Sequence, residues 1–322
     1  CALPIEVDAF GGLSLHASIG VVQYPQDGFD ARDLLRNAQA ALHQTKSNAR
    51  SYIEVYCSDI ADEAARDVAL ESQLRTVLAE DEFLLHYQPQ VHLETGQTIG
   101  VEALIRWQHP VRGLVAPGEF IPMIDAGDLA GPVGCWVLNA AARDAVRWQK
   151  LDIPPLHVSV NICPAHIISG TFAEDVTHAL NTSGLDPQSL KLEVLESAVI
   201  HDMEGALAEL ERMRALGVSL ALDDFGTGYS SLSYLKNIPV DTVKIDRMFV
   251  ANLVSSSEDA AIVRSTISMA HNLGQKVVAE GVETEAQLLH LMRMGCDMIQ
   301  GYLACRPIPR EQLDTQIAEN GR

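Results

Sequence analysis

The sequence lacks several features that would point to particular classes of protein. No run approaches the roughly 20 apolar residues that a membrane-spanning helix needs. The first residues, Cys1 to Glu6, resemble neither an initiator segment nor a signal peptide. The six cysteines are scattered without a Cys-x-x-Cys pair, which argues against a zinc site or a disulfide framework. We therefore expect a cytoplasmic fragment with reduced thiols and no membrane contact of its own, although missing N-terminal regions could tether the full-length protein.

Basic residues are also scarce. The chain has 23 Lys and Arg against 43 Asp and Glu, so its formal net charge is -20 at pH 7. A negative surface repels nucleic-acid polymers and anionic membranes, and neither is expected as a partner. An anionic substrate would need metal cations or local Arg and Lys. Hydrophobic residues, in contrast, make up 47% of the 322 residues, which is enough for a substantial core.

The N-terminal part reads as two short segments. Residues 1–56 predict a strand over 13–22, a helix over 31–46 and a closing strand over 52–56, which is too little to stand alone. Residues 57–80 form an acidic stretch without Gly or Pro, whose apolar positions have helical spacing. We interpret this stretch as a linker helix.

Eight strand-like runs follow over residues 81–322. They begin near Phe83, Thr98, Leu156, Leu190, Val218, Asp241, Gln275 and Asp297. From the second run onward they alternate with helical patterns over 134–150, 164–183, 203–216, 230–237, 262–273, 283–294 and 310–319. This alternation predicts an α/β fold with a parallel sheet closed into a (β/α)8 TIM-type barrel. Only residues 92–97 separate the first two runs, too few for a crossover helix, so the first strand is predicted to be antiparallel.

Polar residues gather at the predicted strand ends, where such a barrel carries its catalytic side chains. The pair Asp223-Asp224 ends the apolar run that begins at Val218 and precedes Phe225-Gly226-Thr227-Gly228. Taken alone, this pair fits a solvated turn equally well. The other strands contribute Glu102, Asn161, Glu193, Glu196, Lys244, Asp246, Glu280 and Gln300. For any one of these, a structural hydrogen bond is the simpler interpretation, but several acids at one barrel mouth indicate a site.

The chemistry of these groups favours a particular kind of metal. Oxygen ligands without His or Cys suit Mg2+ or Mn2+ better than zinc. An Asp-Asp pair with further carboxylates suits two such ions about 4 Å apart, which share one carboxylate and a bridging water. The sequence therefore predicts phosphodiester hydrolysis.

The same motifs resemble a known family. Glu102-Ala103-Leu104 with Arg106 resembles the EAL signature, and Asp223 to Leu232 is similar to the active-site loop of that family. Three further motifs match in order: Val243-Lys244-Ile245-Asp246, Ala279-Glu280-Gly281-Val282-Glu283 and Gln300-Gly301-Tyr302-Leu303. The resemblance covers about residues 70–309.

Residues 1–56 resemble the C-terminal part of a second family, the GGDEF domains. The similarity rests on Ser18-Ile19-Gly20-Val21 and the helix Leu34 to Leu42. The signature turn of that family is absent, and its Ala-Asp-x-Ala-Leu-Tyr motif is here Ala38-Gln39-Ala40-Ala41-Leu42-His43. We therefore expect a degenerate remnant without catalysis.

The EAL resemblance implies hydrolysis of cyclic di-GMP to linear pGpG in bacterial second-messenger signalling, with two Mg2+ or Mn2+ ions. The implied metal ligands are Glu102, Asn161, Glu193, Asp223, Asp224 and Glu280, and the implied catalytic set is Lys244, Glu280, Glu102 and Asp223. Substrate contacts are implied for Gln88, Leu104, Arg106, Asp246 and Gln300, and Glu196 would anchor the loop after Asp224. The resemblance also implies a homodimer through the barrel. Ca2+ is larger and less exacting in geometry than Mg2+, so it is expected to inhibit by permitting binding without hydrolysis.

Two positions depart from the family pattern. Leu195 stands where the family has Thr, and Asp125 stands where it has Glu. Both changes could lower turnover or affinity. A rival interpretation is a catalytically weak or inactive cyclic di-GMP receptor, but every implied metal ligand is present. A different metallohydrolase on the same barrel remains a third interpretation.

Overall fold

The computed structural model describes residues 17–47, 53–57, 70–150, 155–196, 198, 203–226 and 237–320. The chain divides into two compact units, residues 1–77 and 78–322. Most of the predicted linker helix lies outside the described part, although residues 70–74 are helical. Among the described residues, no helix has the length and apolar character needed to cross a membrane.

The described part of the first unit is one small α/β layer. Strands β1 (Ile19–Val21) and β2 (Ile53–Val55) pair in parallel, and helix α1 (Ala31–Ser47) packs against both. A Cβ atom on Gly20 would lie 2.3 Å from the carbonyl oxygen of Ala38, so the helix can approach the strand only at a glycine. The predicted helix is confirmed, the predicted strand over 13–22 is confirmed at residues 19–21, and the predicted strand over 52–56 is confirmed at residues 53–55. Residues 13–16 lie outside the described part, and the assignment to a GGDEF remnant stays a prediction.

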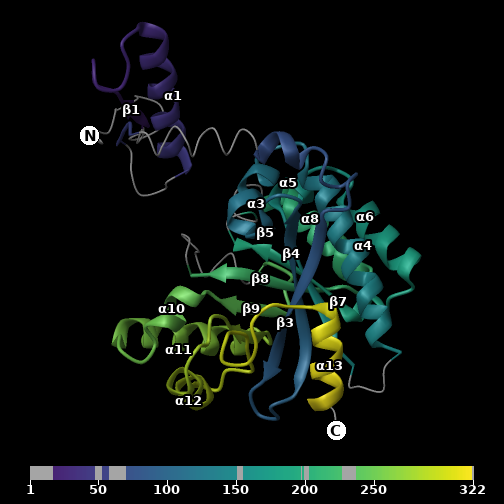
Figure 1. Ribbon diagram of the computed structural model, residues 1–322. Helices are drawn as coiled ribbons and strands as arrows, with labels where there is room; N and C mark the ends of the chain where they lie inside the picture. Colours follow the sequence, from purple (N-terminus) through teal and green to yellow (C-terminus); the bar gives the residue numbers. More distant parts are fainter. Residues whose placement is uncertain are drawn as a thin grey trace. The chain divides into compact units, whose positions relative to one another are not determined.

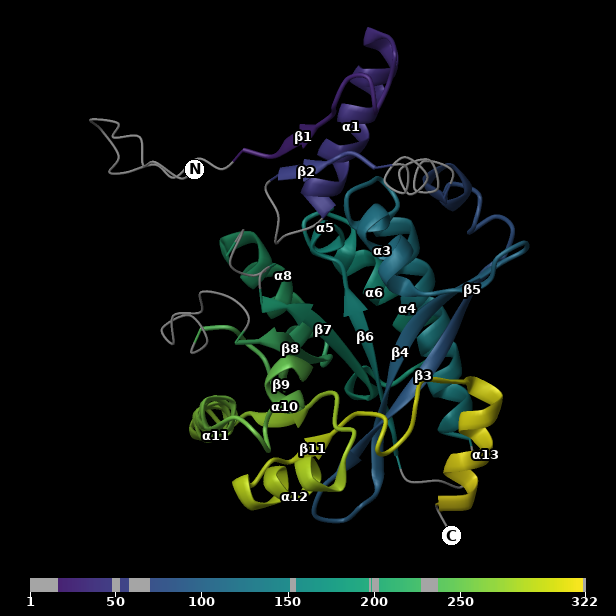
Figure 2. The ribbon, with the colours of Figure 1, turned by 60° about the vertical axis from the view of Figure 1, so that its left-hand side comes forward.

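The second unit is a barrel (Figures 1 and 2). Around the ring run β3 (Phe83–His92), β4 (Thr98–His109), β6 (His157–Ile162), β7 (Leu190–Leu195), β8 (Ser219–Phe225), β9 (Thr242–Ile245), β10 (Lys276–Ala279) and β11 (Met298–Ile299), which pairs back with β3. The strands from β4 through β11 run parallel around the ring, whereas β3 is antiparallel to both of its ring neighbours. The predicted modified barrel is therefore confirmed.

The parallel strands are apolar because both of their faces are covered, one by helices and one by the barrel interior. Val158 and Val160 of β6 and Leu190, Leu192 and Val194 of β7 are fully buried. Two short strands that the sequence did not predict extend this sheet. They are β5 (Gly113–Val115), which pairs with β4, and β12 (Ile308–Pro309), which pairs with β3.

Helices follow the parallel strands, as predicted. They are α4 (Ala130–Trp148), α5 (Pro164–Ile167), α6 (Phe172–Ser183), α8 (Met203–Ala215), α11 (Ser257–Asn272), α12 (Glu285–Met294) and α13 (Arg310–Asn320). Three further elements were not predicted: α3 (Pro117–Asp125), the 3-10 turn η1 (Pro187–Ser189) and α10 (Arg247–Ala251). Helix α4 packs beside α6, and α13 lies along β3 (Figure 1). Of the helix predicted over 230–237, only residue 237 is described.

One helix prediction is wrong. The sequence predicts a single helix over 164–183, but the structure has α5 and α6, separated by residues 168–171. Gly170 takes a positive φ of 82° in this gap. The hydroxyl of Ser169 donates to the carbonyl of His166 at 2.7 Å and accepts the N–H of Thr171 at 3.1 Å. A side chain that satisfies backbone groups in this way replaces helical hydrogen bonds, and the apolar pattern does not reveal it.

Candidate active site

The acids and the lysine predicted at the strand ends meet at the C-terminal end of the barrel. Glu102 lies in β4, Glu193 in β7, Asp223 in β8 and Lys244 in β9, and all four are buried. Successive side chains of a strand point to opposite faces. Glu193 therefore points to the interior of the barrel, while its apolar neighbours in β7 face the helices.

Lys244 is the centre of this cluster and is only 1% exposed. Its Nζ lies 2.7 Å from Glu280 Oε1, 3.2 Å from Asp223 Oδ1 and 3.8 Å from Glu102 Oε1. It also donates to Glu193 Oε2. Four carboxylates thus share one ammonium group, and a single positive charge cannot balance them.

Burial and the neighbouring charges shift the pKa values of Lys244, Glu193 and Glu280. Burial by itself would lower the pKa of Lys244, but the four surrounding carboxylates raise it well above its usual value. Burial raises the pKa of Glu193 to about 7 and that of Glu280 to about 8, against the opposing effect of Lys244. Lys244 is therefore held as an ammonium, and the excess acids favour either a proton or another cation.

Asp223 and Asp224 lie at an irregularity in the sheet, because the register between β8 and β9 shifts between Leu222 and Phe225. Asp224 has a positive φ of 54° and donates its N–H to Asp223 Oδ1 at 3.0 Å. A non-glycine residue in this region carries strain on the order of 1 kcal/mol. Burial, a hydrogen bond with Asp246 and the charge of Asp223 together raise the pKa of Asp224 to about 7. Strain and desolvation at adjacent acids are typical of a functional site.

These residues fit a divalent cation. Asp223, Asp224 and Glu280 offer carboxylate oxygens that lie within 4.8 Å of one another. The donors are hard oxygen ligands, as Mg2+ and Mn2+ prefer. The raised pKa values of Asp224 and Glu280 indicate negative charge that a bound cation would balance.

Amide side chains hold the cluster in place. Asn161 Nδ2 donates to Glu102 Oε1 at 2.5 Å, and the amide of Gln300 donates to Glu102 Oε2. The same Gln300 amide lies 3.1 Å from Gln88 Oε1. Of the residues predicted to contact substrate, Gln88 and Gln300 are thus brought to the acids, and both carboxylate oxygens of Glu102 are oriented by amides.

Two members of this network were missed by the sequence reasoning. Gln90 Nε2 donates to Gln300 Oε1 at 3.0 Å and lies 3.4 Å from Glu193 Oε1. Its own Oε1 is 2.9 Å from His157 Nε2. The two-residue period of a strand could have found Gln90, because it shares a face with Gln88. No local signal in the sequence points to His157.

Glu196 lies where a loop anchor would be needed. Its Oε2 accepts the N–H of Gly226 at 3.0 Å, directly after the strand that carries the acid pair. The rest of the predicted loop, residues 227–232, lies outside the described part of the chain. The role of Glu196 in loop movement stays a prediction.

Asp246 and Arg106, two predicted substrate contacts, have partners within the protein, and their contact with substrate stays a prediction. Asp246 caps α10 by accepting the N–H of Met248 at 2.6 Å, in addition to its contact with Asp224. Arg106 donates to the carbonyl of Ile105 at 2.8 Å. Arg106 is not among the described residues that line the pocket over the acids.

That pocket has a volume of about 230 Å3. Its lining comprises Gln88, Glu102, Leu104, Asp223, Arg247, Glu280, Gly281, Glu283, Gln300, Gly301 and Tyr302. Arg247, Glu283 and Tyr302 were not predicted. Arg247 adds a positive charge to a mainly acidic lining, and an anionic substrate would need such a charge.

A second, largely apolar pocket of about 260 Å3 shares Leu104 with the first. Asn161, Leu195 and Asp125 also line it. The two positions that depart from the family pattern therefore lie in one pocket beside the acids, although they are far apart in the sequence.

Comparison with known proteins decides the family. The family model of the EAL domain matches residues 71–307. The chain belongs to the EAL domain family. The EAL resemblance seen in the sequence is thereby confirmed.

Curated relatives extend the EAL match over most of the chain. The chain is 40% identical over 311 residues to the cyclic di-GMP phosphodiesterase NbdA of Pseudomonas aeruginosa, which covers 97% of this chain and 40% of the relative. It is 41% identical over 304 residues to the bifunctional diguanylate cyclase/cyclic di-GMP phosphodiesterase MucR of the same organism. This match covers 94% of this chain and 44% of MucR. The chain thus spans less than half the length of these two relatives.

Solved EAL structures share the fold. The PaMucR phosphodiesterase in complex with c-di-GMP superimposes with a TM-score of 0.74 at 43% identity, covering 76% of this chain and 99% of that chain. The EAL enzyme Bd1971 bound to cAMP and cyclic di-GMP gives a TM-score of 0.74 at 30% identity, and the match covers 91% of this chain and 77% of the Bd1971 chain.

Proposed function

We propose that this EAL barrel hydrolyses cyclic di-GMP to linear pGpG with two Mg2+ or Mn2+ ions. The observation that carries the proposal is the set of carboxylates gathered around Lys244, in a barrel whose relatives are named cyclic di-GMP phosphodiesterases. The structure of PaMucR in complex with c-di-GMP supports the choice of substrate.

The metal ions have proposed ligands in this arrangement. Glu102, Asn161, Glu193 and Asp223 would hold one ion, and Asp223, Asp224 and Glu280 would take part in holding the second. When bound, the ions would supply an activated water and stabilise charge on the phosphodiester.

The side chains around the ions would position the reaction. Lys244 stays protonated, and its contacts with Glu280 and Asp223 fix the orientation of both acids. Glu280 also lines the pocket, where it can accept a hydrogen bond from the attacking water. Gln88 lines the same pocket and donates to the carbonyl of Cys305 at 3.0 Å, so its second amide hydrogen can be donated to a phosphate oxygen of the substrate. Gln300, whose amide donates to Glu102 and Gln88, would hold Gln88 in place for this contact.

Chromatography of cyclic di-GMP incubated with the protein tests this proposal. We expect pGpG to accumulate with Mg2+ or Mn2+ and to be absent in EDTA. If calorimetry shows tight binding but no pGpG forms with either ion, the chain is a receptor rather than an enzyme. Faster hydrolysis of a different phosphodiester in direct competition would indicate another metallohydrolase.

Calcium gives a test of the metal requirement. Ca2+ adopts longer bonds and more variable coordination than Mg2+, so it should fill the site without the geometry that hydrolysis needs. We expect Ca2+ to support binding of cyclic di-GMP and to inhibit hydrolysis in the presence of Mg2+. Full turnover with Ca2+ alone would contradict the two-ion proposal.

Residues 1–56 are proposed to be the remnant of a GGDEF domain. The match to MucR, which is named as a bifunctional cyclase and phosphodiesterase, covers 94% of this chain and so reaches beyond the EAL match at residues 71–307. We also propose that the barrel forms a homodimer in the cytoplasm. Analytical ultracentrifugation of the chain tests the dimer, since a monomer at micromolar concentration would contradict it.

A further inference from the structure

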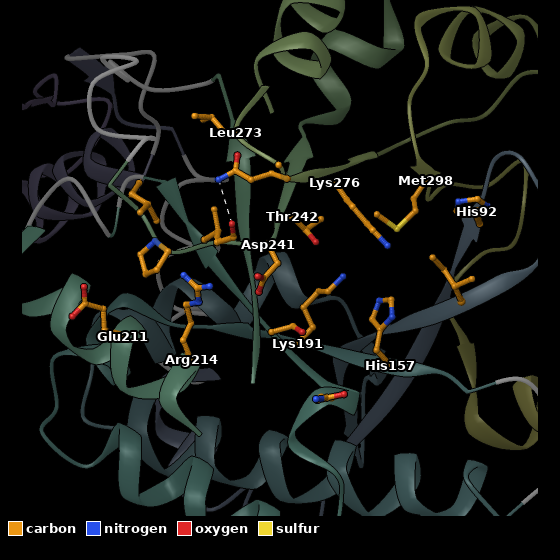
Figure 3. Close-up of a pocket in the computed structure, with 18 of the residues that line it drawn as sticks. His92, His157, Lys191, Glu211, Arg214, Asp241, Thr242, Leu273, Lys276 and Met298 are labelled. Carbon is orange, nitrogen blue, oxygen red and sulfur yellow. Dashed lines mark hydrogen bonds between the residues drawn. The ribbon is translucent and has the colours of Figure 1, made fainter. Parts of the chain in front are cut away.

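A pocket of about 990 Å3 lies at the N-terminal end of the barrel strands (Figure 3). Its lining includes the first residues of several strands, among them His157 of β6, Thr242 of β9 and Lys276 of β10. The acidic cluster lies at the opposite, C-terminal ends of the same strands. The pocket is therefore distinct from the proposed active site.

Lys191 is the unusual residue of this pocket. It is only 7% exposed, although a lysine is rarely buried without a partner. Among the residues that the structure describes, it has no hydrogen bond to its ammonium group and no ion pair. The carboxylates of Glu193 and Asp241 attract this ammonium group from beyond ion-pair distance. Burial of an ammonium group without a direct partner is costly, so Lys191 presents to the pocket a charge that no hydrogen bond or ion pair within the described chain satisfies.

A second ammonium group faces the same space. Figure 3 shows Lys191, Lys276 and His157 around one part of the pocket. The three groups lie close enough to interact electrostatically. Burial lowers the pKa of His157 to about 3, and the charges of Lys191 and Lys276 add to this effect. His157 is thus neutral at physiological pH, and the two lysines repel each other across the pocket. A bound anion would remove this repulsion.

The acids of the pocket do not pair with these lysines. Asp241 Oδ2 accepts the N–H of Leu220 at 2.9 Å, and within the described part of the chain it forms no ion pair with Lys191 or Lys276. Arg214, an exposed residue at the end of α8, adds a third cation to the lining. Such a concentration of cations is unexpected in a chain with a formal net charge of -20.

We propose that this pocket binds a small phosphate-bearing anion between Lys191 and Lys276, with Arg214 at the rim. Phosphate suits the lining, because ammonium groups bind it as point charges and the hydroxyls of Ser219 and Thr242 can donate to further oxygens. The proposal is independent of the hydrolysis of cyclic di-GMP.

Calorimetric titration with inorganic pyrophosphate tests the site directly. The titration is done on the full chain in EDTA, so that the acidic cluster holds no metal and repels the probe. We expect one pyrophosphate per chain. Binding should weaken about tenfold or more in Lys191→Met, because one of the two facing charges is lost while the apolar volume is kept.

Substitutions at exposed positions test the site without the risk of misfolding that a change at the buried Lys191 carries. Lys276→Gln and Arg214→Gln change exposed side chains and should also weaken binding, whereas Lys150→Gln, a matched change at an exposed position outside the pocket, should not. Absence of binding to the unmodified chain would overturn the proposal, and so would binding by Lys191→Met and Lys276→Gln as tight as that of the unmodified chain. Citrate that binds as tightly as pyrophosphate would overturn the assignment to phosphate.

Discussion

At the scale of single residues, Lys244 connects the site. One buried ammonium contacts Glu102, Glu193, Asp223 and Glu280, which belong to four different parts of the barrel. Burial, together with the charges of the neighbouring acids, raises the pKa values of Glu193 and Glu280, and the excess of acids over the single cation favours metal ions. Conservative substitutions at single acids should therefore separate catalysis from folding.

We expect Asp223→Asn to lower turnover of cyclic di-GMP by more than about a hundredfold, because it removes a shared metal ligand and leaves the side-chain shape unchanged. Lys244 keeps three other carboxylate partners, so the thermal midpoint should not fall. Steady-state kinetics and a thermal melt in EDTA measure the two effects. An unchanged rate would mean that the metals lie elsewhere.

Leu195 is a second residue that can be tested alone. It pairs with Asp223 across β7 and β8 and lines the apolar pocket beside the acids. A hydroxyl at this position could donate to the substrate or to a ligand, so Leu195→Thr should raise kcat/KM several-fold, by about 1 kcal/mol of binding. Leu195→Val, which has no hydroxyl, is the matched control. If kcat/KM rises equally in both variants, the smaller side-chain volume and not the hydroxyl is the cause.

At the scale of elements, the site depends on how strands end. Glu280 follows β10 and Gln300 follows β11, and each is succeeded by a glycine. A Cβ atom on Gly301 would lie 2.2 Å from the carbonyl oxygen of Val282, which is backbone and cannot move away as a side chain can. The close approach of these two segments places Gln300 beside Glu102.

Gly301→Ala should therefore displace Gln300 and destabilise the barrel by about 1–3 kcal/mol, as overpacking does. Turnover should fall along with the thermal midpoint. Gly131→Ala is the control, since a Cβ atom there meets nothing within 4 Å and the residue lies in helix α4. A Gly301→Ala variant as stable and active as Gly131→Ala would contradict the close packing.

At the scale of the whole molecule, a net charge of -20 and a buried acidic cluster make stability depend on cations. The folded pKa values of Glu193, Asp224 and Glu280 lie above their usual values, so the folded state binds more protons than the unfolded state between about pH 5 and pH 8. Stability without metal should therefore fall as pH rises through this range.

Thermal melts in EDTA at pH 5, 6, 7 and 8 would measure this fall. Mg2+ binds the deprotonated carboxylates, so it should raise the thermal midpoint most at pH 8 and least at pH 5. The variant Asp224→Asn, which lacks one of the raised pKa values, should show a shallower fall. A midpoint in EDTA that is constant from pH 5 to pH 8 would contradict the charge excess.

The sequence by itself determined the strand and helix order, the antiparallel first strand and the identity of the acids. The element order follows from the period of the hydrophobic residues, and the antiparallel first strand follows from the short connection over residues 92–97. The acids were identified because they lie in short motifs of consecutive residues. It did not reveal the turn at Gly170, where a hydroxyl of Ser169 replaces helical hydrogen bonds.

Only the tertiary structure decided which residues meet. It brought Gln90 and His157 into the network around Glu102. It also placed the buried Lys191 beside Lys276, more than eighty residues away in the sequence, at the opposite end of the barrel. Periodicity tells which face of a strand a side chain occupies, but closure of the ring determines its neighbours, because each strand pairs with partners far along the chain.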